Sequence, residues 1–598
     1  MGSFVKKVFV LLSIFIFSVF SQEGKEEFFD LGEVVITGTK IEKKVEDMPF
    51  SICVIDREEI EKSGAQTLSD VLNFLPGIFV ERTGDFGRTD PEIRGIGNNG
   101  RKIMVMIDGV PVKMGLFGCT ITHSLPIANI ERIEVVRGGS SVLYGSDALG
   151  GVINIITREM KKEGFYTDVS ISGGSYDTYQ FLLNHGGKKG KFDYFFTVDR
   201  IISQGHRPQS EYKSADYMLK MGYEISENTK VSLFLKNFHG KKWELGPEGG
   251  PILPDLPDDY RRDTHNLKIL NKGKEHEFSL TFFHNFGHHK LKNGWHSRDH
   301  TYGSEIRYTT FTFLNNELTL GSDWQWFGGK RLNYAPDKWC RYQYSSYIWN
   351  EHEFENLIFT LGGRYSRDSV SGGEFCPQGG FVCKFGNGNR VRANVSKAFR
   401  FPQLNELYMF PPSNTDLKPE KVLTYELGYN QRVNDWLTYD ITGYYMDGED
   451  LIQVVSGKFK NVGDFTFKGV EIGIEGKWEN FKSTLYYSYL DPGNRTKGIA
   501  KNKLDLILNY KRDKFNILGT VQYVFDYYSG DNSTGKLSDY TVVNTRFSYE
   551  MNPYVELFLG IDNIFDEEYL VYVDLPGMAA GNYPMPGRTF TFGIKGKF

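Results

Sequence analysis

Histidine is the residue type whose spacing most suggests chemistry in this chain. Four of the 12 histidines lie in or beside the segment GHHKLKNGWHSRDH. Imidazole nitrogens bind zinc, copper, nickel and iron, so this group could hold a metal chelate or haem. The spacing of the last two histidines would bring them onto one face only in a helix, and Gly294 and Trp295 favour a polar surface loop as the alternative. The candidate metal ligands are His288, His289, His296 and His300.

Two further patterns match known sites only in part. Residues 95–100 have GxGxxG spacing, but a dinucleotide site needs a following helix, and the strand-like RKIMVMIDG comes next, which favours a turn. The acidic loop 242–261 offers oxygen ligands for Ca²⁺, yet it lacks EF-hand spacing, so a solvated loop is favoured. No P-loop, GxSxG or HExxH pattern occurs. The sequence therefore predicts neither an enzyme nor a required cofactor.

Composition excludes a bundle of membrane helices and gives no sign of nucleic-acid binding. Hydrophobic residues make up 40% of the chain, and the mean hydropathy is −0.39. The net charge is −5, and no basic block stands out. Residues 1–21 have the features of a secretory signal peptide, with Lys6 and Lys7 ahead of an apolar run at 8–20. That run is shorter than the roughly 20 residues of a membrane-spanning helix.

From about residue 159 to residue 598 the chain alternates apolar and polar residues with period two. Near the end, Phe590, Phe592 and Ile594 share one face, and Thr589 and Thr591 share the other. About 22 such segments are joined by alternating short turns and long loops, as in a transmembrane barrel. A sheet that crosses a bilayer must close on itself to satisfy its backbone groups. We therefore expect a 22-stranded antiparallel barrel in an outer membrane, with soluble β-sandwiches as the alternative.

A separate unit at 41–158 precedes the barrel and mixes helical and strand patterns. Residues 63–77 contain leucines at helical spacing and end at Pro76 and Gly77, whereas KIMVMIDGVPV and IERIEVVRG favour strands. Barrels of 22 strands enclose a wide lumen that is plugged. The sequence thus predicts a small α+β plug domain, after a flexible polar segment at 22–40.

The five cysteines do not describe a disulfide framework. Cys376 and Cys383 are the closest pair, but they fall on one expected strand, where seven residues span roughly 23 Å. Disulfides need Cα atoms within about 7 Å of each other. We therefore predict that these two cysteines are not bonded to each other.

The motifs, in their order, resemble those of TonB-dependent outer-membrane receptors over nearly the whole chain. GEVVITGTK resembles a TonB box, IRGIGNNGRKIMVMIDGVPV and IERIEVVRGGSSVLYGSDALGGVINIIT resemble plug motifs, and SKAFRFPQLNELY and PGRTFTFGIKGKF resemble barrel signatures. The resemblance implies import powered by a TonB-like inner-membrane protein. The length of this chain is similar to that of the smaller cobalamin or siderophore receptors. We expect a monomer embedded in outer-membrane lipid, of a Gram-negative-type bacterium, with a small-molecule ligand and no nucleic-acid partner.

The ligand is expected to be a ferric siderophore, cobalamin or a related metal chelate. Haem transporters of the family usually carry a histidine in the loop that corresponds to 402–418, and this loop has none. A haem receptor of the same fold, a passive porin and an outer-membrane hydrolase are the alternatives. Ligand contacts are expected at the plug apex, around 84–90 and 111–123. The candidates are Asp85, Phe86, Arg88, Lys113, Met114, Phe117 and His123.

Two groups of residues are candidates for coupling. A β-prone stretch in the polar segment could add to the sheet edge of a TonB-like partner, unless it is simply the first plug strand. It comprises Glu33, Val34, Val35, Ile36 and Thr37. The resemblance also implies that plug arginines pair with lumen-facing glutamates of the barrel wall and hold the plug in register. The alternative is that these charges are separate and solvated. The matching positions are Arg94, Arg137, Glu426 and Glu471.

Overall fold

The computed structural model describes residues 35–36, 40–97, 101–250, 255–311, 315–333, 337–386, 388–409, 412–574 and 579–598. The expected signal peptide at 1–21 and most of the segment at 22–40 lie outside the described residues.

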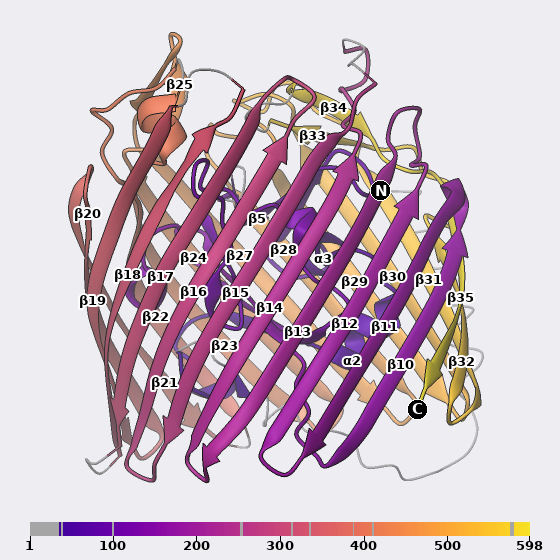
Figure 1. The fold of residues 1–598 in the computed structure, drawn as a ribbon, viewed down its shortest axis with the longest axis horizontal. Helices are drawn as coiled ribbons and strands as arrows, with labels where there is room; N and C mark the ends of the chain where they lie inside the picture. The colour runs from indigo at the N-terminus through magenta and orange to yellow at the C-terminus, as the bar shows by residue number, and fades with distance from the viewer. Residues whose placement is uncertain are drawn as a thin grey trace.

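Twenty-two antiparallel strands close into one barrel, in which β10 pairs with β35 (Figure 1). This confirms the strand number, the pairing and the closure expected from the period-two pattern. The strands are β10 Gly164–Gly174, β11 Thr178–Lys189, β12 Phe192–Ser203, β13 Tyr212–Ser226, β14 Thr229–Lys242, β15 Asp258–Lys272, β16 His276–Lys290, β17 His296–Thr310, β18 Asn316–Arg331, β19 Lys338–Phe354, β20 Leu357–Asp368, β21 Gly372–Phe385, β22 Asn389–Arg400, β23 Glu420–Asn434, β24 Leu437–Glu449, β27 Phe465–Trp478, β28 Phe481–Asp491, β29 Ala500–Arg512, β30 Phe515–Tyr527, β31 Tyr540–Asn552, β32 Val555–Asp562 and β35 Thr589–Lys597.

The two faces of each strand have opposite chemistry. On β23, Tyr425 and Leu427 point outward and are 45% and 61% exposed, whereas Glu426 between them is 5% exposed. Outward apolar side chains suit hydrocarbon, and inward polar side chains suit a filled lumen. Among the described residues no helix is long and apolar enough to cross a membrane.

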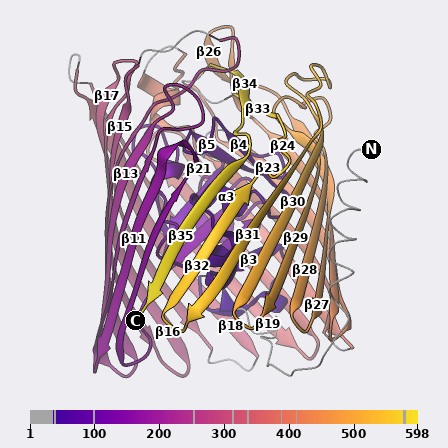
Figure 2. The same cartoon turned by 90° about the vertical axis from the view of Figure 1, so that its right-hand side faces the viewer.

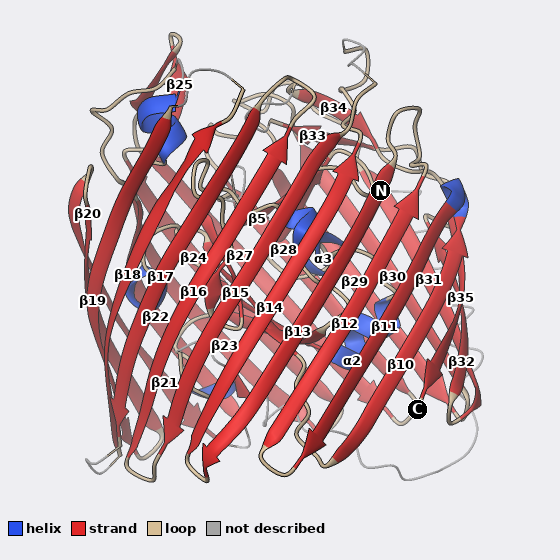
Figure 3. Cartoon of the chain, in the orientation of Figure 1, coloured by secondary structure: helices blue, strands red, loops and turns tan. Residues whose placement is uncertain are grey.

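The plug lies inside the barrel (Figures 1 and 2). Its five-stranded sheet has the order β3-β8-β9-β6-β7. A hairpin of β4 and β5 and three short helices complete it, and Figure 3 separates these helices from the strands around them. The bounds are β3 Ile52–Asp56, α2 Arg57–Ser63, α3 Leu68–Leu72, β4 Ile78–Arg82, β5 Thr89–Ile93, β6 Ile103–Ile107, β7 Val110–Pro111, β8 Ile130–Arg137, α4 Ser141–Tyr144 and β9 Gly151–Thr157.

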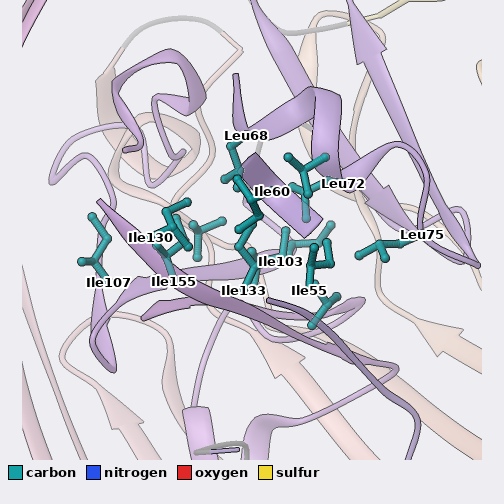
Figure 4. Packing of buried hydrophobic residues seen from close by; sticks show 14 of the residues in the cluster. Ile55, Ile60, Leu68, Leu72, Leu75, Ile103, Ile107, Ile130, Ile133 and Ile155 are labelled. Atoms are coloured by element: carbon teal, nitrogen blue, oxygen red, sulfur yellow. The ribbon is translucent and has the colours of Figure 1, made fainter. Parts of the chain in front are cut away.

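Local sequence explains where the plug helices start and stop. Asp56 caps α2 by accepting a hydrogen bond from Glu59 N, and the Glu59 side chain accepts one from Asp56 N. Gly64 ends the helix at φ 68°, a conformation that glycine adopts without strain. Ile60 and Leu68 then pack with the isoleucines of the sheet in one core (Figure 4).

Short turns and longer loops alternate between the strands as expected, but the prediction of one loop is wrong. The histidine-rich segment was expected to form a loop at 289–300, whereas β16 ends at Lys290 and β17 starts at His296. The strands continue past their apolar outward residues with polar ones, so hydropathy alone places the strand ends too early. Two outer hairpins, β25 Ile452–Val455 with β26 Lys458–Asn461 and β33 Leu570–Val573 with β34 Gly581–Pro584, were not expected.

All five cysteines are free thiols. Cys376 and Cys383 lie on β21, as expected, and are not bonded to each other.

Candidate functional site

A buried ion cluster between the plug and the barrel wall is built around Arg94. Its guanidinium is bidentate to Glu471 on β27, with Nε to Oε1 at 2.9 Å and Nη2 to Oε2 at 3.0 Å. Its Nη1 donates to Glu426 on β23 at 2.8 Å. Arg94 has φ 53°, in the turn after β5, and its side chain is fully buried. Burial alone would lower the pKa of Arg94, but the carboxylates of Glu471 and Glu426 raise it above its usual value.

Arg137, at the end of β8, completes this group. Its Nη1 lies 2.5 Å from Oε2 of Glu471 and also donates to the carbonyl of Pro76. We call Arg94, Arg137, Glu426 and Glu471 the lock cluster; the structure brings together all four residues that the sequence suggested. Removing one partner of a buried ion pair costs about 3–5 kcal/mol, because the other charge is left without compensation.

A second buried ion cluster was not expected from the sequence. Plug residues Lys102 and Arg101 lie 3.3 Å from Glu420 and 3.7 Å from Glu406, respectively. Arg400 on β22 pairs with both glutamates. All five side chains are at most 10% exposed. Arg400 and Glu406 stand in the segment FRFPQLNEL, so charges inside an apolar stretch were the signal that could have located this cluster.

Three of the expected ligand contacts at the plug apex are at most 8% exposed: Phe86, Lys113 and Met114. Phe86 stacks on Tyr212 with ring centroids 4.8 Å apart. Lys113 pairs with Asp147 at 2.5 Å and is 5% exposed. Met114 is also 5% exposed. These side chains have little exposure because the apical loops reach across the lumen and pack on the barrel wall.

The other four candidates at the apex are half-buried: Asp85, Arg88, Phe117 and His123. Phe117 packs edge-on against Trp295 at 5.5 Å, and His123 packs against Tyr260 at 4.8 Å. Burial, followed by the charge of Lys242, lowers the pKa of His123 well below its usual value. Half-exposed aromatic and charged groups at the outer end of the plug are the chemistry expected of a ligand floor.

The four histidines proposed as metal ligands do not form one site. His289 points into the lumen and is 1% exposed, near Asp299. His288 faces outward and contacts His296 at 2.8 Å, whereas His300 contacts His284 at 3.1 Å. Neighbouring residues on a strand point to opposite faces, which separates His288 from His289. In the described part of the chain, no group of three or more His, Cys, Asp or Glu side chains is placed to hold a metal.

In the described part of the acidic loop, no group of three or more acidic side chains is placed to hold a metal. Glu244 pairs with Lys242 and accepts a hydrogen bond from Thr83. Asp258 accepts a hydrogen bond from Lys292 N. Both carboxylates thus have hydrogen-bond partners within the protein.

Two residues of the expected coupling segment are described, and they form a strand. β1 Val35–Ile36 pairs antiparallel with β2 Lys43–Lys44. Glu33, Val34 and Thr37 lie outside the described residues. Lys43 ties this small ribbon to the wall through Glu317 at 2.6 Å and Glu351 at 2.7 Å.

Comparisons with known proteins agree with this architecture. Residues 44–152 match the TonB-dependent receptor plug domain, and residues 163–564 match the family described as TonB dependent receptor-like, beta-barrel. The vitamin B12 transporter BtuB of Photobacterium profundum is 24% identical over 568 residues, covering 90% of this chain and 92% of that protein.

Two solved structures share the fold. The siderophore receptor PirA from Acinetobacter baumannii has a TM-score of 0.80 at 18% identity, covering 93% of this chain and 99% of that one. A mutant of the ferric enterobactin receptor PfeA from Pseudomonas aeruginosa also has a TM-score of 0.80, at 17% identity, covering 94% and 100%. The chain therefore belongs to the TonB-dependent receptors, which are transporters and not enzymes, and it is an integral outer-membrane protein with a plugged 22-stranded barrel.

Proposed function

We propose that this receptor imports a large metal chelate, either cobalamin or a ferric siderophore, with energy supplied through the β1 segment. The observation that carries the proposal is the lock cluster. A plug that lies in the lumen and is held by ion pairs whose side chains are at most 5% exposed costs much free energy to displace. Passive diffusion through such a barrel is disfavoured, which argues against a porin.

The pairing of β1 supports coupling through this segment. In its described part, Val35 and Ile36 pair with β2, and a partner strand can replace those main-chain hydrogen bonds with its own. The TonB-like protein would then pull on a segment that leads directly into the plug. Such an exchange of strands uses main-chain hydrogen bonds and needs no particular side chain at Ile36.

Cobalamin is the first ligand to test. The BtuB relative is matched over nearly its whole length, whereas the siderophore receptors share the fold at lower identity. The half-buried aromatic and charged groups at the apex, such as Phe117 and Arg88, suit a bulky chelate with both apolar and polar surfaces.

The test is uptake of radiolabelled cyanocobalamin and ferric enterobactin by cells that depend on this receptor. We expect energised uptake of one of them, and its loss when the proton motive force is dissipated. Ile36→Pro should abolish uptake, because proline removes a main-chain donor from the strand. Ile36→Val keeps the strand and is the matched control. Uptake that continues without the proton motive force, or that is unchanged in Ile36→Pro, would refute the proposal.

A further inference from the structure

The outer half of the barrel wall is interrupted between β21 and β22. Their ladder runs from the inner turn only as far as Gln378, which lies opposite Ser396. Both strands continue outward from there, and among the described residues 372–377 of β21 do not pair with 397–400 of β22. On their other sides the two strands stay paired to their outer ends, with β20 and β23. We call this unpaired stretch the seam.

Local sequence explains why the ladder stops there. Pro377 is the first residue of β21 beyond the ladder, and proline has no N–H to donate to a neighbouring strand. On the other side of the seam, Phe399 and Phe401 are fully buried. They belong to one apolar cluster with Cys376 of β21 and with plug residues such as Val142. Side-chain packing therefore takes the place of main-chain pairing along the seam.

Plug residues satisfy the main-chain groups that β21 leaves unpaired. Phe399 N donates to Oγ of Ser141 at 3.1 Å, and Phe399 O accepts from Asp147 N at 3.3 Å. Phe401 N donates to Oγ of Ser146 at 3.1 Å. Since β22 stays paired with β23 on its other side, the groups of Phe399 lie on the side that β21 has left. The plug thus acts as the missing neighbour of β22.

We call residues 141–147, which comprise α4 and the turn after it, the closing segment. Its helix contacts β19–β22. A Cβ added at Gly362 of β20 would lie 3.0 Å from Val142. Just ahead of the closing segment, a Cβ added at Gly139 would lie 2.8 Å from that of Ala398 on β22. These close approaches on both sides of the seam show that the plug is built into the wall at this point.

Ion pairs also cross the seam. Glu374 of β21 lies 3.3 Å from Lys397 of β22 and 3.5 Å from Lys421 of β23. The two lysine side chains are 30% and 28% exposed, so solvent weakens both pairs. Parting the seam would break these pairs and some apolar contacts, but no ladder hydrogen bond. Parting paired strands would break main-chain hydrogen bonds, which are costly to leave unmade.

We propose that the seam opens when the closing segment moves, so that the barrel widens along this line as the plug rearranges. With the segment seated, Phe399 and Phe401 have their hydrogen-bond partners and the wall is closed. Once it leaves, the described contacts that join the two sides of the seam are between side chains. The opening rests on the proposed function, because a bulky chelate needs a wider lumen, whereas the closure by the plug does not.

The first experiment uses Cys376 as a native reporter, because its thiol is fully buried at the seam. The rate of maleimide labelling is measured in purified receptor that keeps only this cysteine. Ser141→Ala combined with Ser146→Ala removes two acceptors of the closing segment. Ser124→Ala is the matched control, since this buried serine is hydrogen-bonded within the plug. A second set of variants keeps only Cys119, which is buried in the apical loop and reports general loosening of the plug.

We expect the double variant to raise the labelling rate of Cys376 at least tenfold and that of Cys119 at most twofold. Ser124→Ala should change neither rate, because it leaves the closing segment intact. Labelling of Cys376 that stays within twofold in the double variant would overturn the proposal. An equal rise at both cysteines would also overturn it, since the whole plug would then be loosened.

A bridge across the seam tests whether it opens during transport. In a variant without native cysteines, Glu374→Cys and Lys397→Cys are joined by a bismaleimide with a cleavable disulfide. The matched control keeps Cys383 and joins it to Val391→Cys, directly opposite in the paired half of the same two strands. Energised uptake of radiolabelled cyanocobalamin and ferric enterobactin is measured before bridging, after bridging and after cleavage.

We expect the bridge across the seam to reduce uptake at least fivefold, with recovery on cleavage, and the control bridge to leave more than half of the uptake. Equal uptake with the two bridges would overturn the opening. Absence of energised uptake of both probes before bridging would refute the proposed function and the opening with it. The labelling of Cys376 would then still decide whether the plug closes the seam.

Discussion

The lock cluster predicts that Glu471→Gln makes the plug much easier to displace. Glu471 accepts hydrogen bonds from Nε and Nη2 of Arg94 and from Nη1 of Arg137. The amide has nearly the same shape but no charge, so two buried guanidinium groups would share the single carboxylate of Glu426. Truncating one partner of a buried pair costs about 3–5 kcal/mol.

We take about 3 kcal/mol, because the amide oxygen still accepts a hydrogen bond and Glu426 still compensates Arg94. At about 1.4 kcal/mol for each factor of ten, the fraction of molecules with a displaced plug should rise roughly 100-fold. The cost falls on the seated state, since a displaced plug exposes the same groups to water.

The assay is ion conductance of purified receptor in planar bilayers, where the fraction of time open reports plug displacement. Glu475→Gln is the matched control, on the same strand and the same face. Glu475 pairs with Lys477 at 3.1 Å and is 19% exposed, so its loss should cost about 0–1 kcal/mol and raise the open fraction at most about fivefold. If Glu471→Gln opens no more often than Glu475→Gln, the lock cluster does not hold the plug.

Three further predictions concern the plug and the wall around it. Burial, and then Asp90, raises the pKa of Glu92 to about 8; the folded plug therefore keeps a proton that the unfolded chain releases above about pH 4.3. The unfolding free energy should fall as pH rises toward 8, and calorimetry at pH 5.5 and 8.5 should show a smaller difference in Glu92→Gln. Gly115→Ala would place Cβ 2.4 Å from the carbonyl oxygen of His300, so its Tm should drop, by a cost of about 1–3 kcal/mol. Replacing His288 and His296 together with alanine should leave uptake unchanged; a large loss would show that this outward pair acts on the ligand.

The barrel was predictable because the alternation of apolar and polar residues can be recognised within a single strand. The period-two alternation of side chains places Glu426 in the lumen once Tyr425 and Leu427 are assigned to the lipid-facing side, and a short segment is enough to show that pattern. The same reasoning located Glu471, so the wall half of the lock cluster needed no knowledge of long-range contacts.

The missed features depend on contacts between distant parts of the chain. Lys102 meets Glu420, more than three hundred residues away, and no local period marks either residue as a partner. Lys113 and Met114 stand in an apical loop whose sequence does not reveal that it packs on the wall. The four histidines do not converge for a local reason: the segment expected to be a loop is largely strand, and strand alternation separates His288 from His289.

The succession of contacts between the N-terminal segment and the barrel wall predicts how a pulling force would act. Force applied ahead of Val35 passes Ile36 and first meets Lys40, which pairs with Glu305 of β17 at 3.1 Å. It then meets Lys43, which is 16% exposed on its side chain and pairs with Glu317 and Glu351. Asp47, paired with Lys384, is a third anchor before the force reaches β3 and the sheet. The plug would thus be opened from its edge, one anchor at a time, with the lock cluster loaded last.

Lys43→Met tests this sequence of events. The half-buried pairs should contribute about 1–3 kcal/mol, so the rupture at this anchor in single-molecule pulling from the N-terminus should occur at lower force. The other ruptures should be unchanged, because the Lys40 pair, the sheet and the lock cluster are intact. Lys44→Met is the control, since Lys44 is exposed on the same short strand. A pulling trace in which no rupture force is lowered in Lys43→Met would mean that force bypasses this anchor.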